Sequence, residues 1–202
     1  MKKNEIIKKF LLNKKQQKLI NQYLDILTKY NAHTNLVGKS SLVEPWISHV
    51  LDSLQVLPFI KNKNASILDM GTGAGLPGVL LSICGCSDIT LMDSNGKKIN
   101  FLKLINSKLE LEFKPILGRL EKANNIKFDY ITSRALANLD KLFTYSQKFL
   151  KKNTVLIFLK GKTVNEEINF VKKNWVFDMD IKQSISDIRG QLLIIKNLKK
   201  ND

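Results

Sequence analysis

Cysteine and histidine are scarce in this sequence. It contains two cysteines, Cys84 and Cys86, with one residue between them, and two histidines, His33 and His49. Cysteines this close together cannot form an ordinary disulfide, which fits a reducing compartment such as the cytoplasm. No spacing among the four residues matches a zinc motif. We therefore expect no disulfide framework and no metal site, and we expect both cysteines to be small core or loop residues.

Long apolar segments are missing as well. No stretch approaches the roughly 20 apolar residues that a membrane-spanning helix needs. The chain opens with a lysine-rich segment rather than the apolar core of a secretion signal. Its 202 residues, 44% of them hydrophobic, are enough for one domain with a full core. The sequence thus predicts a protein of the cytoplasm without a membrane span.

Arginine is rare although basic residues are abundant. Lysine and arginine together number 33 against 18 acidic residues, a formal net charge of +15, yet the arginines are only Arg119, Arg134 and Arg189. A positive charge suits a polyanionic partner because lysine and arginine release counterions when they neutralise phosphates. Scattered lysines are usually a solvated surface, so charge alone leaves nucleic-acid binding open. Arginine offers a planar fork of donors that lysine lacks, so an arginine kept in a lysine-rich chain indicates a need for that geometry. The alternative is that the three arginines are there by chance, and this alternative is strongest for Arg189.

The first 60 residues are predicted to be helical. Apolar residues recur at spacings of three and four between residues 20 and 30, which indicates an amphipathic helix. A polar turn over 31–40 follows, and residues 42–57 are helical again, with Pro45 tolerated in the first turn. We expect residues 1–60 to form an extension that packs on a domain of residues 61–202, the two making one structural unit.

From residue 66 onward, short apolar runs alternate with helical patterns. The sequence predicts strands at 66–70, 89–92, 112–116, 130–132 and 154–159, and helices at 97–109, 139–150 and 164–173. This alternation predicts an α/β fold with a mainly parallel sheet covered by helices on both faces. The last two extended segments, 175–185 and 191–198, have no helix between them. We therefore expect an antiparallel hairpin at the edge of a seven-stranded sheet.

The strongest motif is a glycine-rich loop between the first strand and the helix that follows it. Residues 69–78 read Asp-Met-Gly-Thr-Gly-Ala-Gly-Leu-Pro-Gly. Glycines here permit a tight turn and let a ligand approach the backbone, and the start of the helix offers free N–H groups. Asp93 lies near the end of the next predicted strand, where a carboxylate can accept both hydrogen bonds of a ribose diol. Together these features predict a nucleotide-like cofactor, with a loop that binds nothing as the alternative.

Three features favour S-adenosylmethionine over a dinucleotide. The carboxylate of Asp69 would repel a pyrophosphate, whereas S-adenosylmethionine carries an ammonium and a sulfonium. Glycines stand at every second position, 71, 73 and 75, unlike the dinucleotide spacing. The closing antiparallel hairpin is typical of methyltransferases. We therefore expect a Rossmann-like class I methyltransferase that depends on S-adenosylmethionine, with an NAD-dependent oxidoreductase as the weakest alternative.

Several motifs together resemble the bacterial RsmG (GidB) family. They are His-Val-Leu-Asp-Ser-Leu at 49–54, the glycine loop with its flanking residues at 68–78, Leu-Met-Asp-Ser at 91–94, Gly-Arg-Leu-Glu at 118–121, Ser-Arg-Ala at 133–135 and Leu-Lys-Gly at 159–161. The match runs from about Tyr23 to Gly161 and resumes weakly at the final hairpin. A generic methyltransferase would share only the glycine loop, so the combination is specific.

The resemblance implies a cytoplasmic enzyme that methylates N7 of one guanine in 16S ribosomal RNA near the decoding site. Its partner would be 16S RNA or the small ribosomal subunit, and we expect a monomer. The resemblance and the glycine loop together give the candidate cofactor contacts: Asp69, Gly71, Gly73, Gly75, Leu76, Asp93, Leu120, Glu121 and Arg134. Arg134 and Lys160 are candidate catalytic residues, and Arg119 and Lys160 are candidate RNA contacts.

Methylation of guanine N7 makes few demands on acid–base chemistry. N7 has a free lone pair and loses no proton, so the site needs no general base and mainly orients two reactants. The sequence has neither the Asn/Asp-Pro-Pro-aromatic motif of amine methyltransferases nor a Pro-Cys nucleophile. Arginine suits a bidentate grip on phosphate or guanine O6, which is the role expected of Arg134, with Arg119 and Lys160 nearby.

Each assigned charged residue has a structural alternative. The alternatives are an ion pair of Arg134 with Asp129 or Asp140, a strand-end charge at Lys160, and a solvated charge at Glu121 beside Lys122. His49 and Asp52 lie three apart on one helical face, so a local pair and a place beside the cofactor pocket are both open. Two other functions are also open: a methyltransferase for a small molecule or protein, and an RNA-binding or ribosome-assembly factor that has lost catalysis.

Overall fold

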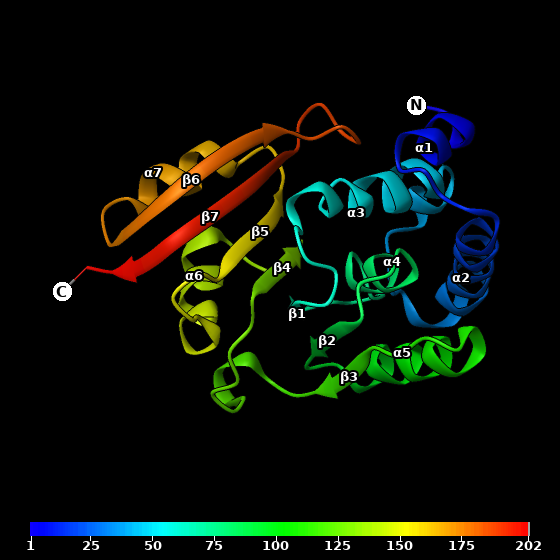
Figure 1. The fold of residues 1–202 in the computed structure, drawn as a ribbon, viewed down its shortest axis with the longest axis horizontal. Helices are drawn as coiled ribbons and strands as arrows, with labels where there is room; N and C mark the ends of the chain where they lie inside the picture. Colours follow the sequence, from blue (N-terminus) through cyan, green and yellow to red (C-terminus); the bar gives the residue numbers. More distant parts are fainter. Residues whose placement is uncertain (202) are drawn as a thin grey trace.

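A computed structural model describes residues 1–201, and within them the strands form one seven-stranded sheet. The strands are β1 (Ser66–Met70), β2 (Asp88–Asp93), β3 (Lys114–Leu117), β4 (Tyr130–Arg134), β5 (Val155–Lys160), β6 (Trp175–Gln183) and β7 (Gln191–Lys200). They lie in the order β3-β2-β1-β4-β5-β7-β6 (Figure 1). Strands β1 to β5 are parallel, and β7 is antiparallel to both β5 and β6. The expected α/β fold, mainly parallel with a closing antiparallel hairpin, is confirmed.

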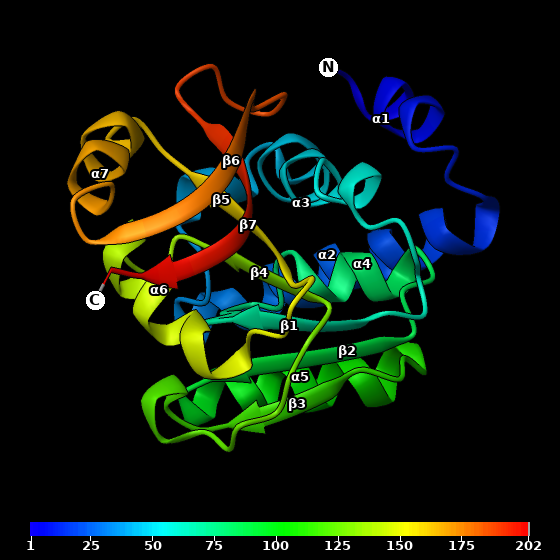
Figure 2. The ribbon, with the colours of Figure 1, turned by 60° about the vertical axis from the view of Figure 1, so that its left-hand side comes forward.

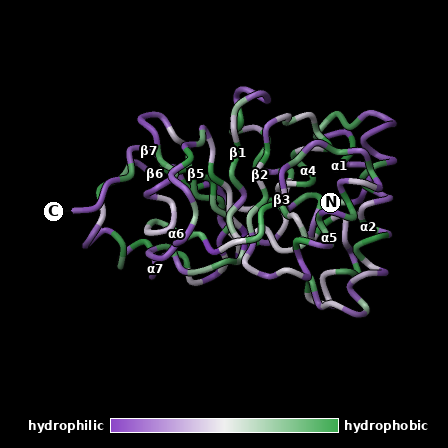
Figure 3. The backbone as a smooth tube through the Cα atoms, turned by 90° about the horizontal axis from the view of Figure 1, so that it is seen from below, coloured by the Kyte–Doolittle hydropathy of each residue, from purple (hydrophilic) through white to green (hydrophobic). Residues whose placement is uncertain are grey.

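Helices cover both faces of this sheet (Figure 2). They are α1 (Lys3–Lys9), α2 (Lys14–Thr34), α3 (Asp52–Leu54), α4 (Gly78–Ile83), α5 (Gly96–Leu109), α6 (Leu139–Ser146) and α7 (Val164–Val171). Successive strand residues point to opposite faces. Ile67 therefore packs in a core with α1, α2, α4 and α5, whereas Leu68 packs in a core with α6 and α7. In Figure 3 the hydrophobic colour is concentrated around β1 and β2, while hydrophilic residues mark the outer turns of α2.

The N-terminal helices share a core with the sheet. Ile6 and Tyr23, from α1 and α2, belong to the same buried cluster as Ile67 and Ile89 of the first two strands. The boundary at residue 60 stays a prediction from the sequence. None of the helices formed by residues 1–201 combines the length and the apolar character that crossing a membrane requires.

Helix α2 continues into the segment 31–40 that was predicted to be a turn, and it ends at Thr34. Asn31 is buried on this helix, and its side chain bonds the backbone of Val37 in both directions, at 3.0 Å from Nδ2 to O and 2.9 Å from N to Oδ1. Asn35 then ends the helix in the left-handed conformation. The prediction of a turn from residue 31 is wrong because Asn31 is a helical residue that fastens the following loop to the helix.

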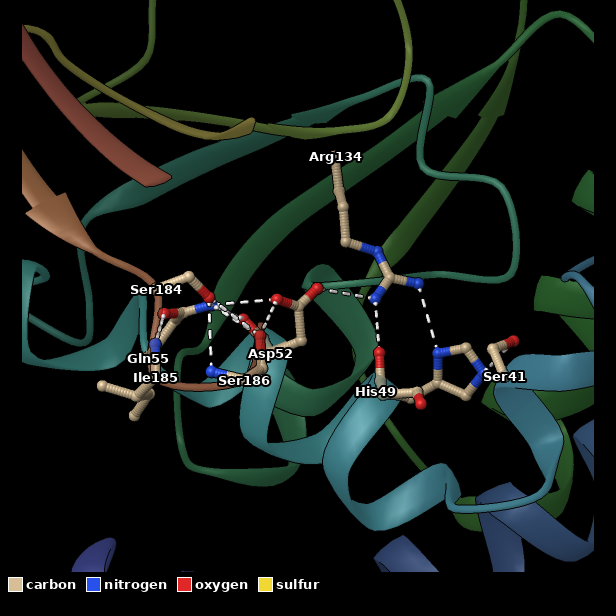
Figure 4. Close-up of polar contacts among 9 residues, drawn as sticks. Ser41, His49, Asp52, Gln55, Arg134, Ser184, Ile185 and Ser186 are labelled. Carbon is tan, nitrogen blue, oxygen red and sulfur yellow. Dashed lines mark hydrogen bonds and ion pairs between the residues drawn. The ribbon is translucent and has the colours of Figure 1, made fainter. Parts of the chain in front are cut away.

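The single helix predicted at 42–57 is also wrong. The structure has 3₁₀ turns at Lys39–Leu42 and Leu57–Phe59, and between them a π-helical segment, Trp46–Leu51, that leads into α3. A π turn is wider than an α turn and is often found at functional sites. Here the segment places the Ser48 carbonyl, His49 and Asp52 against Arg134 at the end of β4 (Figure 4). Apolar periodicity marks the buried face, but it does not indicate contacts with a strand so distant in sequence.

Several element boundaries also shift by a few residues, and two of them serve as examples. The strand predicted at 112–116 is β3, which begins and ends slightly later. The helix predicted at 139–150 is α6 followed by a 3₁₀ turn at Gln147–Phe149. Such shifts are common at element ends, where backbone hydrogen bonding changes gradually.

Candidate active site

The candidate site lies at the carboxyl ends of the parallel strands. Strand β1 is the point at which the chain changes from one side of the sheet, β2 and β3, to the other, β4 and β5. Loops that leave neighbouring strands at such a point diverge and open the crevice in which α/β folds bind ligands. The glycine loop follows β1, Asp93 ends β2, and Arg134 ends β4. The topology therefore brings three separate predicted motifs to one edge of the sheet.

Asp69 forms the inside of the glycine loop. Its side chain has no exposed surface. Oδ2 accepts hydrogen bonds from Thr72 Oγ1 (2.6 Å) and the Gly78 amide (3.2 Å), and Oδ1 accepts one from Thr132 Oγ1 (2.8 Å). Burial raises the pKa of Asp69 to about 6, and these hydrogen bonds oppose the shift. Asp69 lies within the loop, whose shape these hydrogen bonds hold, and the predicted contact of Asp69 with a cofactor stays a prediction.

Two glycines of this loop combine a left-handed backbone with a lack of room for a side chain. Gly71 has a φ of +62°, and a Cβ there would overlap Leu136 in the loop after β4. Gly75 has a φ of +90°, and a Cβ there would overlap Val79 and Leu102. Only glycine combines this conformation with so close an approach. Gly71 thus lets the loop after β4 lie on the glycine loop, and Gly75 lets α5 pack against it.

A cavity of about 200 Å³, here called pocket A, lies beside the glycine loop. Its lining includes Gly71, Asp93, Arg119, Leu120 and Glu121. Four of these are predicted cofactor residues, and they come from three loops that are far apart in sequence. The structure therefore brings together in one cavity four residues that the sequence connects only through separate motifs.

The carboxylate of Asp93 joins the end of β2 to the glycine loop. Its Oδ2 accepts a hydrogen bond from the Gly73 amide (3.0 Å), and its Oδ1 accepts one from the Asn95 amide (2.9 Å). Lys98 Nζ lies 3.4 Å from Oδ2. Asp93 is 7% exposed, so its orientation is fixed by three neighbours while part of it still reaches the cavity.

A second cavity of about 480 Å³, here called pocket B, lies at the ends of β4 and β5, beside the loop that joins β6 to β7. Its lining includes Asp52, Gln55, Arg134, Lys160 and Arg189. The expected proximity of Arg134 and Lys160 is found here, whereas Arg119 lines pocket A. The three candidate RNA-gripping residues are therefore divided between two cavities.

Arg134 is held by the segment that contains the π turn (Figure 4). Nη1 donates to Asp52 Oδ2 (2.9 Å) and to the Ser48 carbonyl (3.1 Å), and Nη2 lies 3.3 Å from His49 Nδ1. The Arg134 side chain is 18% exposed. These three contacts thus fix one side of the guanidinium, and its other side faces pocket B.

The pairings considered for Arg134 from the sequence are wrong. Asp129 instead pairs with Lys151, and Asp140 accepts a hydrogen bond from Trp175 Nε1 at 2.8 Å. The actual partner, Asp52, lies 82 residues before Arg134 in the chain. No local spacing could indicate this contact, because it depends on the packing of α3 against the sheet edge.

His49 is neutral in this arrangement. The contacts assign a tautomer in which Nδ1 accepts from Arg134 and Nε2–H donates to Ser41 Oγ at 3.1 Å. Burial first, and then the charge of Arg134, lower the pKa of His49 from 6.5 to about 4. The imidazole therefore acts as an acceptor that helps to orient Arg134.

We expect His49 to make the folded state sensitive to acid. Unfolded His49 binds a proton below about pH 6.5, whereas folded His49 stays neutral down to about pH 4, so stability falls as the pH falls through this window. Between pH 7.5 and pH 5 the loss attributable to His49 is about 2 kcal/mol. Urea unfolding of the wild type and of His49→Gln at both pH values measures it, and the variant should lack this loss.

The wild type must be compared with His49→Gln because protonation of Asp69 changes the stability of the folded state in the opposite direction. Its pKa is raised to about 6, so the folded state binds the proton more tightly and gains stability as the pH falls from about 6 towards 3.8. Both proteins keep Asp69, so the difference between them isolates His49. Equal pH dependence in the two proteins would contradict the assignment of a neutral, buried imidazole.

Lys160 forms an ion pair that fastens two helices to the end of β5. Its Nζ lies 2.7 Å from Glu167 Oε2 and donates to the Ala137 carbonyl at 2.9 Å. The same Glu167 oxygen accepts a hydrogen bond from the Leu139 amide at 2.7 Å, at the start of α6. The Lys160 side chain is 10% exposed. The ammonium of Lys160 is thus already bonded to two oxygens of the protein itself.

Tyr23 is a site residue that the sequence analysis did not identify as such. It is fully buried on α2, and its hydroxyl donates to the carbonyl of Ala74 in the glycine loop at 2.9 Å. Burial raises the pKa of Tyr23 above its ordinary value. The N-terminal helices therefore help to hold the cofactor loop. The available signal was a tyrosine within an otherwise apolar helix face, because a buried hydroxyl needs a partner.

The scarce cysteines and histidines form no metal cluster in the described part of the chain. Among residues 1–201, no three His, Cys, Asp or Glu side chains lie together in a way that could hold an ion. Cys84 and Cys86 are buried free thiols, and burial raises their pKa values to about 12 and about 11. Both are therefore small core residues rather than reactive groups.

Comparison with known proteins decides the family. A family model described as GidB, rRNA small subunit methyltransferase G, matches residues 16–195. The chain belongs to this family. A GidB-family relative from Rickettsia prowazekii, named ribosomal RNA small subunit methyltransferase G, is 36% identical over 88% of this chain and 92% of the relative. The protein of the same name from Paramagnetospirillum magneticum is 31% identical over 97% of this chain and 96% of the relative.

A solved structure shares the fold of this GidB-family chain. Ribosomal protein L11 methylase from Lactobacillus delbrueckii subsp. bulgaricus aligns with a TM-score of 0.59 over 71% of this chain and 75% of that chain, at 17% identity. A likeness at this identity concerns the fold alone. It confirms the Rossmann-like methyltransferase architecture that the sequence predicts.

Proposed function

We propose that this member of the GidB family transfers a methyl group from S-adenosylmethionine to N7 of one guanine in 16S ribosomal RNA. The observation that carries the proposal is the position of the two cavities on either side of one short loop. Arg134 and Ala135 line pocket B, and the next residue, Leu136, lines pocket A. A cofactor in pocket A and a base in pocket B would therefore meet across three consecutive residues.

Pocket A suits a nucleoside. Met92, Leu120 and Leu136 give it apolar walls for an adenine ring, and Asp93 gives it a carboxylate for a ribose diol. We assign Glu121, next to Leu120, to the edge of the adenine. When bound, S-adenosylmethionine supplies a methyl group that its sulfonium already activates.

The glycine loop is proposed to face the remainder of the cofactor. Gly71, Gly73, Gly75 and Leu76 form this loop, and Asp69 holds its shape from within. Asp69, with a pKa of about 6, is mainly ionised at neutral pH. Its negative charge inside the loop favours a cationic ligand over a pyrophosphate.

The residues of pocket B can orient a guanine without moving a proton. The nucleophile N7 has its own lone pair, and His49, the imidazole beside the pocket, is neutral and already engaged by Arg134. A guanidinium has five N–H donors, so Arg134 keeps donors for guanine O6, an RNA phosphate or the cofactor carboxylate. We retain Arg134 as the leading catalytic candidate on this ground.

Arg119 and Lys160 are proposed in supporting roles. Arg119 lines pocket A and is assigned to RNA phosphate at its rim. Lys160 lines pocket B, but its ion pair with Glu167 would have to exchange before it could grip RNA. We therefore propose that Lys160 contributes mainly by fixing the end of β5. The catalytic role that the family resemblance implies for Lys160 is secondary to this structural one.

The function is tested by transfer of labelled methyl from S-adenosylmethionine to small ribosomal subunits that lack the modification. We expect label in 16S RNA at one guanine, mapped as N7-methylguanine by chain cleavage. Subunits that already carry the modification are the control and should stay unlabelled. If the cofactor binds while particles and RNA remain unlabelled, the function is a different one, either transfer to another substrate or RNA binding without catalysis.

The same resemblance leads us to propose the setting in which the enzyme works. We propose a monomer of the cytoplasm, forming one structural unit, whose partner is 16S RNA or the small ribosomal subunit. The net charge of +15 supports a polyanionic partner.

A further inference from the structure

The loop between β6 and β7, residues 184–190, is closed on itself by backbone hydrogen bonds. The Ser184 amide donates to the Gly190 carbonyl at 3.0 Å, and the Gly190 amide donates to the Asp187 carbonyl at 2.9 Å. The Arg189 amide donates to Asp187 Oδ1 at 2.9 Å. The loop therefore has a defined shape although it projects from the edge of the sheet (Figure 1).

The same loop is fastened to α3 and the residue after it (Figure 4). Ser186 Oγ donates to Asp52 Oδ1 at 2.6 Å, and the Ile185 amide donates to Gln55 Oε1 at 3.1 Å. Gln55 Nε2 donates to Ser184 Oγ at 3.2 Å. Gln55 is only 6% exposed, so this contact is part of the folded interior.

Asp52 connects the loop to the reaction pocket. One of its carboxylate oxygens accepts from Ser186, and the other accepts from Arg134. Asp52 and Arg134 both line pocket B, as do Asp187 and Arg189 of the loop. The position of the loop and the position of Arg134 are therefore set by the same carboxylate.

At its tip the loop presents an isoleucine to solvent. Ile188 is 90% exposed, and the residue beside it, Arg189, is paired with Asp187 at 3.0 Å and 2.8 Å. Lys162 lies on the rim of the same pocket. A single exposed apolar side chain is common on protein surfaces, but this one is held between two residues that line pocket B, and the cations Arg189 and Lys162 on that pocket suit an RNA backbone.

We propose that Ile188 is a wedge that packs against a nucleobase of the RNA substrate next to the guanine held in pocket B, and that Asp52 and Gln55 hold it in place. This inference rests on the proposed function. A base that is stacked in a strand must leave the stack to enter a reaction pocket, and an apolar side chain inserted beside it takes over part of the lost stacking. Gln55 and Asp52 are positioning residues in this account, because they act through the loop.

The test uses the full chain and small ribosomal subunits that lack the modification. For Ile188→Ser we expect the KM for particles to rise roughly tenfold, the scale of losing the burial of one isoleucine side chain, while cofactor affinity and melting temperature stay unchanged. Ile188→Phe should retain activity because it keeps a large apolar surface. The matched control is Val176→Ala, a 61% exposed residue at the opposite end of the same hairpin, which should behave as the wild type.

The positioning role is tested by Ser186→Ala, which removes the hydroxyl that donates to Asp52. It should raise the KM for particles in the same direction, and adding Ile188→Phe to it should not restore the wild-type value. A photoreactive side chain at position 188 should crosslink to 16S RNA in the bound particle. Crosslinking to a ribosomal protein instead would assign the tip to a protein partner and overturn the proposal.

The outcomes separate this inference from the function on which it rests. A wild-type chain that labels particles, with Ile188→Ser equal to it, refutes the wedge and leaves the function intact. A wild-type chain that labels no particles refutes the function. In that case particle binding by Ile188→Ser and the crosslink still decide whether the tip touches RNA.

Discussion

Asp93→Ala is expected to weaken the binding of S-adenosylmethionine at least about 100-fold. The variant removes a carboxylate that can accept two hydrogen bonds from a ribose diol, and hydrogen bonds to a charged group contribute about 1.5–3 kcal/mol each. A loss of about 3 kcal/mol corresponds to a factor of roughly 100 in the dissociation constant. Titration calorimetry with the cofactor measures it.

Two controls separate this loss from damage to the loop, since Asp93 also holds the Gly73 and Asn95 amides. Asp93→Asn keeps one acceptor oxygen, which can hold one of the two amides, and should lose less affinity than Asp93→Ala. Asp88→Ala lies at the other end of the same strand, where the Asp88 side chain is half-buried and pairs with Lys114, and it should bind the cofactor as the wild type does. Unchanged affinity in Asp93→Ala would remove Asp93 from the cofactor site.

Arg134→Met is expected to lower kcat/KM on small-subunit particles roughly 100-fold, which corresponds to about 3 kcal/mol of lost transition-state stabilisation. Methionine keeps an unbranched side chain as far as the position of Nε but donates no hydrogen bonds. Arg134→Lys should also be impaired, because an ammonium cannot reproduce a planar fork that contacts Asp52, Ser48 and His49 together. Steady-state methyl transfer on particles measures both variants.

A double variant distinguishes a functional arginine from a structural one. Arg134→Met leaves the partly buried Asp52 without its cation, which should cost about 2 kcal/mol of folding stability. Asp52→Asn in the same chain removes the unpaired charge and keeps an oxygen for Ser186, so stability should recover. Activity should not recover if Arg134 acts on the substrates. Recovery of both stability and turnover would show that Arg134 serves only to balance Asp52.

Local sequence carried the information for the sheet and for the cofactor loop. The apolar runs at β1 and β5 were readable because residues buried on both faces leave a continuous pattern. The closing pair of extended segments was readable because no helical pattern separates the two. The glycines at 71, 73 and 75 were readable because left-handed backbone favours glycine, and at Gly71 and Gly75 close packing also leaves no room for a Cβ. Features of this kind depend on neighbours in the chain.

The sequence predicts the secondary structure of the segment before the sheet, residues 31–57, less accurately. The sequence predicts ordinary helix where the structure has the π turn at Trp46–Leu51, and it predicts a turn from Asn31, which lies in α2. In both places the deciding contact is polar and lies outside the local pattern: Arg134 for the π turn, and the backbone of Val37 for Asn31. Apolar periodicity does not indicate polar contacts of this kind.

The sequence by itself determined the fold class, the cofactor loop and the family, because hydrophobic alternation and glycine geometry are local and the family motifs are contiguous. Only the tertiary structure decided what the charged residues do. It placed Asp69 inside the loop, paired Arg134 with Asp52 and Lys160 with Glu167, and put Arg119 in the other cavity. The physical reason is that a charged group is satisfied by whichever partner folding brings within hydrogen-bond distance, and that partner is set by strand order and helix packing rather than by spacing along the chain.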